Sequence, residues 1–122
     1  MSVLETRLIQ NSESAIKNDQ AMRGLVSQLR EKVKETHAGG GQKAMEKHTN
    51  RGKLPARERI NALLDEASGF LEIGALAADG MYGGGIASAG VVAGIGRVEG
   101  IECMIVANDA TVKGGTYFPM TV

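Results

Sequence analysis

The fold of this chain is decided by the stretch Gly90-Val-Val-Ala-Gly-Ile-Gly-Arg-Val-Glu-Gly-Ile-Glu-Cys-Met-Ile-Val-Ala-Asn-Asp-Ala-Thr-Val-Lys-Gly-Gly-Thr-Tyr-Phe-Pro119. Two apolar runs, Val91–Val98 and Ile101–Ala107, are separated by the dipeptide Glu99-Gly100. Glycine adopts a positive φ without steric cost, so a short Glu-Gly link between two apolar runs is typical of a hairpin turn. The stretch therefore predicts a β-hairpin that leads into a glycine-rich bend.

Charge pairing supports one register for this hairpin. A two-residue loop places Val98 opposite Ile101 and Arg97 opposite Glu102, and opposite charges that face each other across two strands are favourable. The same register pairs Gly96 with Cys103 and Gly94 with Ile105. Both faces of the hairpin are then mostly apolar, which predicts burial on both sides. The covering elements are expected to lie outside this chain.

The residues before the hairpin show helical patterns. Apolar residues recur at helical spacing between Ser12 and Thr36, and the glycines at 39–41 are suited to end that helix. Shorter helices are expected at Gln42–Thr49 and at Pro55–Asp65, the latter with Pro55 at its first helical position. A short strand is expected at Phe70–Ile73. Helices followed by a twisted sheet predict an α+β fold.

Composition restricts the classes of function. The chain has 122 residues, no net charge, 3% aromatic residues and no Trp. A core without large side chains buries little surface per residue, which fits a part of a larger assembly. No basic patch with interleaved aromatics is present, so nucleic-acid binding is not expected. No apolar run reaches the roughly 18 residues that span a bilayer, so no membrane insertion is expected. The lone Cys103 sits at an apolar strand position and is expected in the core.

The bend at Ala110–Thr116 is the first candidate site. Glycines let a ligand approach the main chain, and exposed N–H groups at a bend can hold an anion or a polarised oxygen. The alternative is a tight turn that leads into a helix. Asp109 is the only acid close to the bend, and as a turn residue it is expected to bond its own backbone.

A line of basic residues is the second candidate. Lys43, Lys47 and Arg51 fall at i, i+4 and i+8, and they form either a solvated face paired with Glu46 and Glu58 or a contact with a neighbouring subunit or with phosphate groups. The glycines at 39–41 do not form a Walker motif. His37 and His48 lack partners at metal-ligand spacing, so no metal site is expected.

Several motifs, in order, resemble one family. Together with the hairpin and the bend, His37-Ala-Gly-Gly-Gly-Gln-Lys43, Arg51-Gly-Lys-Leu-Pro-Ala-Arg-Glu-Arg-Ile60 and Phe70-Leu-Glu-Ile73 resemble the carboxyltransferase (beta) subunits of biotin-dependent acyl-CoA carboxylases, and most closely those of methylcrotonoyl-CoA carboxylases. The likeness spans nearly the whole chain. The loop at Met81–Ile86 departs from it, because the family carries more acidic residues there.

The resemblance implies a fold and a substrate site. It implies a helical segment over residues 1–66 and, over residues 67–122, the incomplete beginning of a crotonase-like carboxyltransferase domain. In that superfamily a segment like the bend borders coenzyme A. The implied acyl-CoA contacts are Ala110, Thr111, Lys113, Gly114 and Gly115, with no catalytic residue among them and no metal.

The resemblance also implies partners and a reaction. The intact subunit is expected to form a homo-oligomer and to act with a partner that carries biotin carboxylase and the biotin carrier and that uses ATP and bicarbonate. The expected reaction is carboxylation of a branched unsaturated acyl-CoA in leucine degradation, in the bacterial cytoplasm or, in a eukaryote, the mitochondrial matrix. The implied oxyanion segments lie beyond residue 122, so the chain is expected to be inactive alone. A propionyl- or acetyl-CoA carboxyltransferase and a non-enzymatic interaction module are the alternatives.

Overall fold

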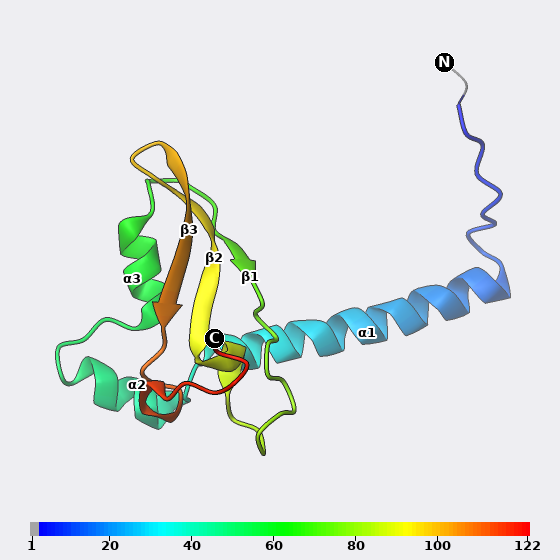
Figure 1. The fold of residues 1–122 in the computed structure, drawn as a ribbon. Helices are drawn as coiled ribbons and strands as arrows, with labels where there is room; N and C mark the ends of the chain where they lie inside the picture. Colours follow the sequence, from blue (N-terminus) through cyan, green and yellow to red (C-terminus); the bar gives the residue numbers. More distant parts are fainter. Residues whose placement is uncertain (1–2) are drawn as a thin grey trace. The chain divides into compact units, whose positions relative to one another are not determined.

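The computed structural model describes residues 3–122 and divides the chain into two compact units, one that ends at Lys32 and one from Val33 to Val122. Three helices come first and a three-stranded antiparallel sheet follows (Figure 1). The α+β class predicted from the sequence is confirmed. The division into compact units falls at a different place from the predicted domain boundary at residue 66, and that boundary stays a prediction.

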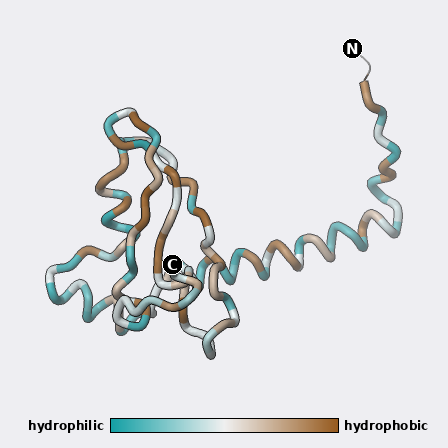
Figure 2. Tube along the Cα trace, in the orientation of Figure 1, coloured by the Kyte–Doolittle hydropathy of each residue, from teal (hydrophilic) through white to brown (hydrophobic). Residues whose placement is uncertain are grey.

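Helix α1 runs from Glu13 to His37, as the periodicity predicts. Its first turn is capped by Ser12, whose Oγ accepts a hydrogen bond of 3.3 Å from the Ala15 N–H. Gly39 and Gly41 adopt φ angles of 56° and 88° directly after it. No residue of α1 is buried, and its tube alternates between apolar and polar colours along its length (Figure 2). The helix is therefore amphipathic, but its apolar side chains are exposed or only half-buried.

The hairpin has the predicted register. Strands β2 (Val91–Val98) and β3 (Ile101–Asn108) pair so that Val98 lies opposite Ile101 and Arg97 opposite Glu102, and the Gly96–Cys103 and Gly94–Ile105 pairs follow. Glu99 and Gly100 take φ angles of 51° and 77°, as a two-residue turn between twisted strands requires. Both of their N–H groups donate to the carboxylate of Asp65, at 2.6 and 2.8 Å. The turn is thus fixed by a side chain outside the hairpin.

Only one face of the hairpin is buried. Helix α3 (Ala56–Leu63) packs on it, and its Ile60 joins Val92 and Ile105 in the main core. Cys103 packs against this core but is only half-buried. The opposite face carries apolar side chains that are 39% to 65% exposed, namely Leu71, Ile95, Met104 and Val106. Within residues 3–122 a single layer covers the sheet, so burial of the second face, whose cover is expected outside this chain, stays a prediction.

Short elements complete the sheet and its cover. Strand β1 (Leu71–Ile73) pairs with β2 along the edge opposite β3, in the order β1-β2-β3. Helix α2 (Gln42–Thr49) has the predicted bounds. Pro55 precedes α3 as its N-cap, with extended ψ of 153°, and is not its first helical residue. Proline serves at either position because both leave its missing N–H without an intrahelical role.

A second, smaller core lies at the open end of the hairpin, where the chain enters β2 and leaves β3. Ala78, Ile86, Ala89 and Val112 are buried together, and Phe118 packs against them. The glycine-rich loop at 81–86 is folded onto this core, because the Tyr82 and Phe118 rings lie 5.2 Å apart. Among residues 3–122, no helix is long and apolar enough to cross a bilayer.

Candidate functional site

The bend after β3 is a turn held by hydrogen bonds within it. The Oδ1 atom of Asp109 accepts hydrogen bonds from the Thr111 N–H at 2.9 Å and from the Thr111 hydroxyl at 2.6 Å. The Val112 N–H donates to the Asp109 carbonyl at 3.1 Å. Asp109 and Thr111 are buried. Asp109 therefore bonds its own backbone, as predicted, and it fixes the direction in which the chain leaves the strand.

The turn between α1 and α2 packs against this bend, although 71 residues separate the two segments. The Gly40 N–H donates to the Thr111 hydroxyl at 3.0 Å. A Cβ on Gly40 would collide with the carbonyl group of Thr111, and one on Gly39 would lie 2.8 Å from the Asp109 carboxylate. The close approach of two backbones explains why glycines occupy these positions. We call this contact between Gly39, Gly40, Asp109 and Thr111 the glycine–threonine contact.

The contact brings α2 beside the bend and leaves a pocket of about 280 Å³ between them. The segment around residues 113–115, red in Figure 1, lies next to α2. Helix α2 and the turn after it form one wall, and the bend forms the other. The lining residues are Ala44, Lys47, His48, Arg51, Lys53, Ala110, Thr111 and Gly114.

One wall of the pocket is basic and unpaired. Within the described chain, no carboxylate lies in ion-pair range of Lys47, Arg51 or Lys53. Glu46, expected to pair with this line, instead accepts a hydrogen bond of 2.9 Å from Gln42. The His48 ring contacts the Leu54 carbonyl at 3.2 Å. The positive charge of this wall is therefore not neutralised by an ion pair within residues 3–122.

The other wall offers main-chain groups. Lys113 and Gly114 have φ angles of 46° and 72°, in the left-handed region. Over residues 3–122, no carbonyl or side chain accepts a hydrogen bond from either N–H group. Successive N–H groups at such a turn suit an anion or a polarised oxygen. With Ala110 and Gly114 at the wall, no bulky side chain blocks the approach of a ligand.

The predicted acyl-CoA residues are brought together only in part. Ala110, Thr111 and Gly114 line the pocket. The Lys113 side chain extends elsewhere, with its Nζ 3.6 Å from the position of a Cβ on Gly85. Gly115 is structural, because a Cβ there would lie 3.0 Å from the Asn108 side chain. His48 and Lys53 were not predicted as site residues, and the only signal for Lys53 is its place in a basic run that begins at Lys47.

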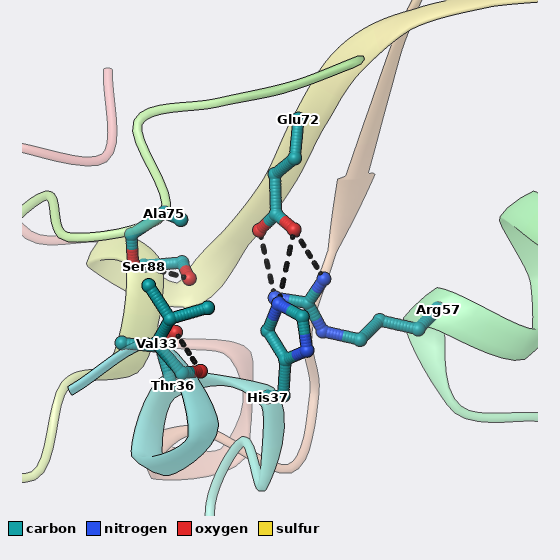
Figure 3. Close-up of polar contacts among 7 residues, drawn as sticks. All are labelled: Val33, Thr36, His37, Arg57, Glu72, Ala75 and Ser88. Carbon is teal, nitrogen blue, oxygen red and sulfur yellow. Dashed lines mark hydrogen bonds and ion pairs between the residues drawn. The ribbon is translucent and has the colours of Figure 1, made fainter. Parts of the chain in front are cut away.

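A second polar cluster is formed by Arg57, Glu72 and His37 (Figure 3), none of which lines this pocket. Arg57 of α3 donates two hydrogen bonds, of 2.6 and 2.7 Å, to the carboxylate of Glu72 on β1. The His37 ring, at the end of α1, lies 3.3 Å from the same carboxylate. The Glu72 side chain is 15% exposed, so the fork between Arg57 and Glu72 ties the helix to the edge strand in a mostly buried setting. No group of three or more metal-ligating side chains is found among residues 3–122.

This cluster predicts a loss of stability in acid. The hydrogen bonds from Arg57 hold the pKa of Glu72 below its usual range, against the opposing effect of burial, and His37 lowers this pKa further. A lowered pKa means that the ion pair stabilises the fold above the ordinary pKa of a glutamate, near 4.5, and that this contribution disappears as the pH falls through the lower, folded value. We expect Arg57→Met to lower the free energy of unfolding by about 1–2 kcal/mol at pH 7, and by less at pH 3. Urea denaturation at both pH values measures the difference.

The exposed pair Arg97–Glu102 is the control for this prediction. Its atoms lie 3.8 Å apart and its side chains are largely exposed. Glu102→Gln is therefore expected to change the free energy of unfolding by at most about 1 kcal/mol. An Arg57→Met variant that is as stable as the parent protein at pH 7 would show that the fork does not stabilise the fold.

Comparison with known proteins places these features in a family. A family model described as the carboxyl transferase domain matches residues 47–122. The probable methylcrotonoyl-CoA carboxylase beta chain, mitochondrial, of Drosophila melanogaster is 52% identical over 99% of this chain and 21% of its own. The crystal structure of the geranyl-CoA carboxylase beta subunit of P. aeruginosa superposes with a TM-score of 0.82 at 33% identity, over 95% of this chain and 22% of that one.

A further solved structure has ligands bound. The transcarboxylase 12S hexamer, described with methylmalonyl-coenzyme A and methylmalonic acid bound, superposes with a TM-score of 0.68 at 40% identity, over 78% of this chain and 19% of that chain. The chain spans about a fifth of the length of the curated relatives it matches.

Proposed function

This chain belongs to the carboxyl transferase domain family, and from that membership we propose that it is part of a biotin-dependent carboxyltransferase subunit that moves a carboxyl group from carboxybiotin to an acyl-CoA. The proposed acceptor is 3-methylcrotonoyl-CoA, a branched unsaturated thioester of leucine degradation. Similarity to methylcrotonoyl-CoA carboxylase beta chains at 48% to 56% identity supports this choice over a propionyl- or acetyl-CoA carboxyltransferase. The acetyl-/propionyl-CoA carboxylase beta5 subunits of Mycobacterium tuberculosis are 40% identical to this chain.

The observation that carries the proposal is the pocket between α2 and the bend. An acyl-CoA combines a slender thioester arm with a strongly anionic nucleotide. The pocket combines an open main-chain wall at Ala110 and Gly114 with a wall of unpaired cations. The cationic wall suits the charge of the nucleotide, and the open main-chain wall leaves room for the slender arm.

The role of this segment is to hold the substrate. In the proposed reaction an enolate forms on the acyl group, and main-chain N–H groups stabilise its oxygen. No residue of this chain is assigned to that step. The chain contributes a fixed binding surface, because the glycine–threonine contact holds the bend and α2 together, and a fixed surface lowers the entropic cost of binding.

Biotin belongs to a partner in this proposal. Carboxybiotin would be delivered by a subunit that bears the biotin carrier and the biotin carboxylase, which uses ATP and bicarbonate. No residue of this chain is assigned to any of these three compounds. The hexamer named for the 12S relative supports assembly of the subunit as a homo-oligomer. The mitochondrial names of the eukaryotic relatives support the mitochondrial matrix as its location in a eukaryote, and the bacterial counterpart would be cytoplasmic.

The test of the proposal is a valine at Gly114. In the full-length subunit, Gly114→Val is expected to weaken acyl-CoA binding at least about tenfold, because a branched side chain would occupy the wall that the ligand approaches. The partner's carboxylation of biotin is expected to stay unchanged. Lys113→Ala is expected to have a small effect on binding, since this side chain lies toward Gly85. Isothermal titration with acyl-CoA and a separate assay of biotin carboxylation measure the two activities.

Gly100 provides a matched control. It has a φ of 77°, against 72° at Gly114, and a Cβ at either position meets no other atom within 4 Å. Valine therefore imposes the same backbone cost at both sites, but Gly100 lies in the hairpin turn and not at the pocket. Normal acyl-CoA affinity in a folded Gly114→Val subunit would remove the bend from the substrate site.

A further inference from the structure

Helix α1 carries an apolar stripe that no element within residues 3–122 buries. Met22, Leu25, Val26 and Leu29 form this stripe, and their spacing of i, i+3, i+4 and i+7 places them on one face of the helix. Met22, Leu25 and Leu29 are 59%, 60% and 50% exposed. A contiguous apolar face of this kind is typical of a contact with another element or another chain.

The spacing of the apolar stripe favours a second helix as its cover. Met22, Val26 and Leu29 follow the alternating steps of four and three residues that define a heptad repeat. Ala15 and Asp19 continue these steps toward the start of α1. Asp19 and Val26 then take a positions, and the other three residues take d positions. Valine at an a position with leucine at the next d position favours a pair of helices.

One border of the apolar stripe carries two cations. Arg23 and Arg30 lie seven residues apart at successive e positions of the repeat. Arg23 pairs with Asp19 of its own helix at 2.6 Å, but both side chains are largely exposed and such a pair contributes little. Among residues 3–122, no carboxylate lies in ion-pair range of Arg30. Residues at e positions select the partner helix through salt bridges, so this border favours a partner with an acidic flank.

A second copy of α1 does not supply an acidic flank. In a parallel pair of helices, a positions face each other, so Asp19 would lie against the same residue of the other copy. The residues that face Arg23 and Arg30 in that pair are Asn18 and Leu25, which are not anions. In an antiparallel pair, e positions face e positions, and arginine would lie against arginine. Self-pairing therefore brings like charges together in either direction.

The opposite face of α1 argues against a membrane surface as the cover. Helices that lie on anionic membranes present Lys and Arg along their polar face. The polar face of α1 instead carries Glu31 and Glu35 together with Lys17. Its charges are therefore mixed, and an anionic lipid surface would be repelled by part of them.

We propose that the apolar stripe, with Arg23 and Arg30 at its border, is a docking surface for an amphipathic helix of another protein chain. The partner helix has apolar residues at its a and d positions and Glu or Asp where it faces the two arginines. Burial of the stripe supplies affinity, and the charge pairs select the partner and its register. This inference goes beyond the proposed function, and none of its residues lines the pocket between α2 and the bend.

The experiment titrates two designed peptides into the full-length subunit. Both peptides have three heptads with Leu at the a and d positions; the acidic probe has Glu at its e and g positions, and the basic probe has Lys there. Like charges keep each probe from pairing with itself. Fluorescence anisotropy is expected to show that the acidic probe binds at least about tenfold more tightly, with a preference that falls as salt is added.

Three variants separate the apolar contact from the charge contact. Leu29→Asp is expected to abolish binding of the acidic probe, because it places a charge within the stripe. Arg23→Glu combined with Arg30→Glu is expected to reverse the preference, so that the basic probe binds more tightly. Lys17→Glu is the matched control, since it makes the same charge change on the opposite face of α1, and it is expected to leave both affinities unchanged. Circular dichroism checks that each variant is folded.

Four results would overturn the inference. They are equal affinity of the parent subunit for both probes, no binding of either probe by the folded subunit, displacement of the acidic probe by phosphatidylserine vesicles, and self-association that Leu29→Asp abolishes and that excludes the probe. The last would identify a second copy as the occupant. Acyl-CoA affinity is measured on the same variants and is expected to stay unchanged, so failure of the docking surface leaves the proposed function standing.

Discussion

Gly40→Ala is expected to lower the free energy of unfolding by about 2–3 kcal/mol and to abolish most of the acyl-CoA affinity. The added methyl group would collide with the backbone carbonyl of Thr111, with the Val112 nitrogen only 3.1 Å away. A backbone group cannot rotate aside as a side-chain end can, so the turn and the bend must separate. That separation breaks the hydrogen bond from the Gly40 N–H to Thr111 and moves α2 away from the pocket. Urea denaturation and titration with acyl-CoA on the same protein measure the two effects.

Gly24→Ala gives the opposite sign and serves as the control for this prediction. Gly24 lies inside α1, and a Cβ there meets no other atom within 4 Å. Alanine is expected to stabilise the helix by up to about 1 kcal/mol, because glycine is the poorer helix former. A Gly40→Ala protein with normal stability and normal acyl-CoA affinity would show that the glycine–threonine contact is not a close backbone contact.

Gly94→Ala is expected to detach the edge strand from the sheet and to cost about 2–3 kcal/mol of unfolding free energy. Gly94 pairs with Glu72 of β1 and with Ile105 of β3. A Cβ on it would collide with the Leu71 carbonyl and would lie 2.5 Å from the Phe70 ring. Relief requires β1 to move, and β1 carries Glu72, which binds Arg57 of α3. Amide hydrogen exchange of residues 71–73 is expected to accelerate in this variant.

Gly96→Ala tests the same face of the same strand against a softer neighbour. A Cβ there would collide with the end of the Leu64 side chain, which can change rotamer, and not with a backbone group. Its expected cost is below about 1.5 kcal/mol. Equal costs at Gly94 and Gly96 would contradict the argument that the Leu71 carbonyl makes Gly94 the stricter position.

Local sequence patterns predicted the elements whose contacts are local. The hairpin register follows from the Glu99-Gly100 turn and from the Arg97–Glu102 pair, all within a few residues of one another. The bounds of α2 follow from short-range signals of the same kind. The Asp109 turn is also local, since its partner Thr111 is two residues away.

Predictions that depended on which elements and side chains contact each other in the folded chain were less accurate. Within residues 3–122, α3 covers one hairpin face and the other is exposed, so burial of that second face stays a prediction. The sequence pattern shows that both faces of the hairpin are apolar. It does not show which elements of the structure cover each face. The direction of the Lys113 side chain was likewise outside the reach of spacing arguments.

The sequence by itself determined the strands and their register, the helices, and the glycine bend, because backbone preference and apolar periodicity act over a few residues. Only the tertiary structure decided the site. The pocket forms where residues 39–53 meet residues 109–114, and a hydrogen bond between Gly40 and Thr111 joins these segments across 71 positions. No periodicity links residues so far apart, and only the tertiary structure shows that Lys47 and Arg51 line the pocket while Lys43 does not.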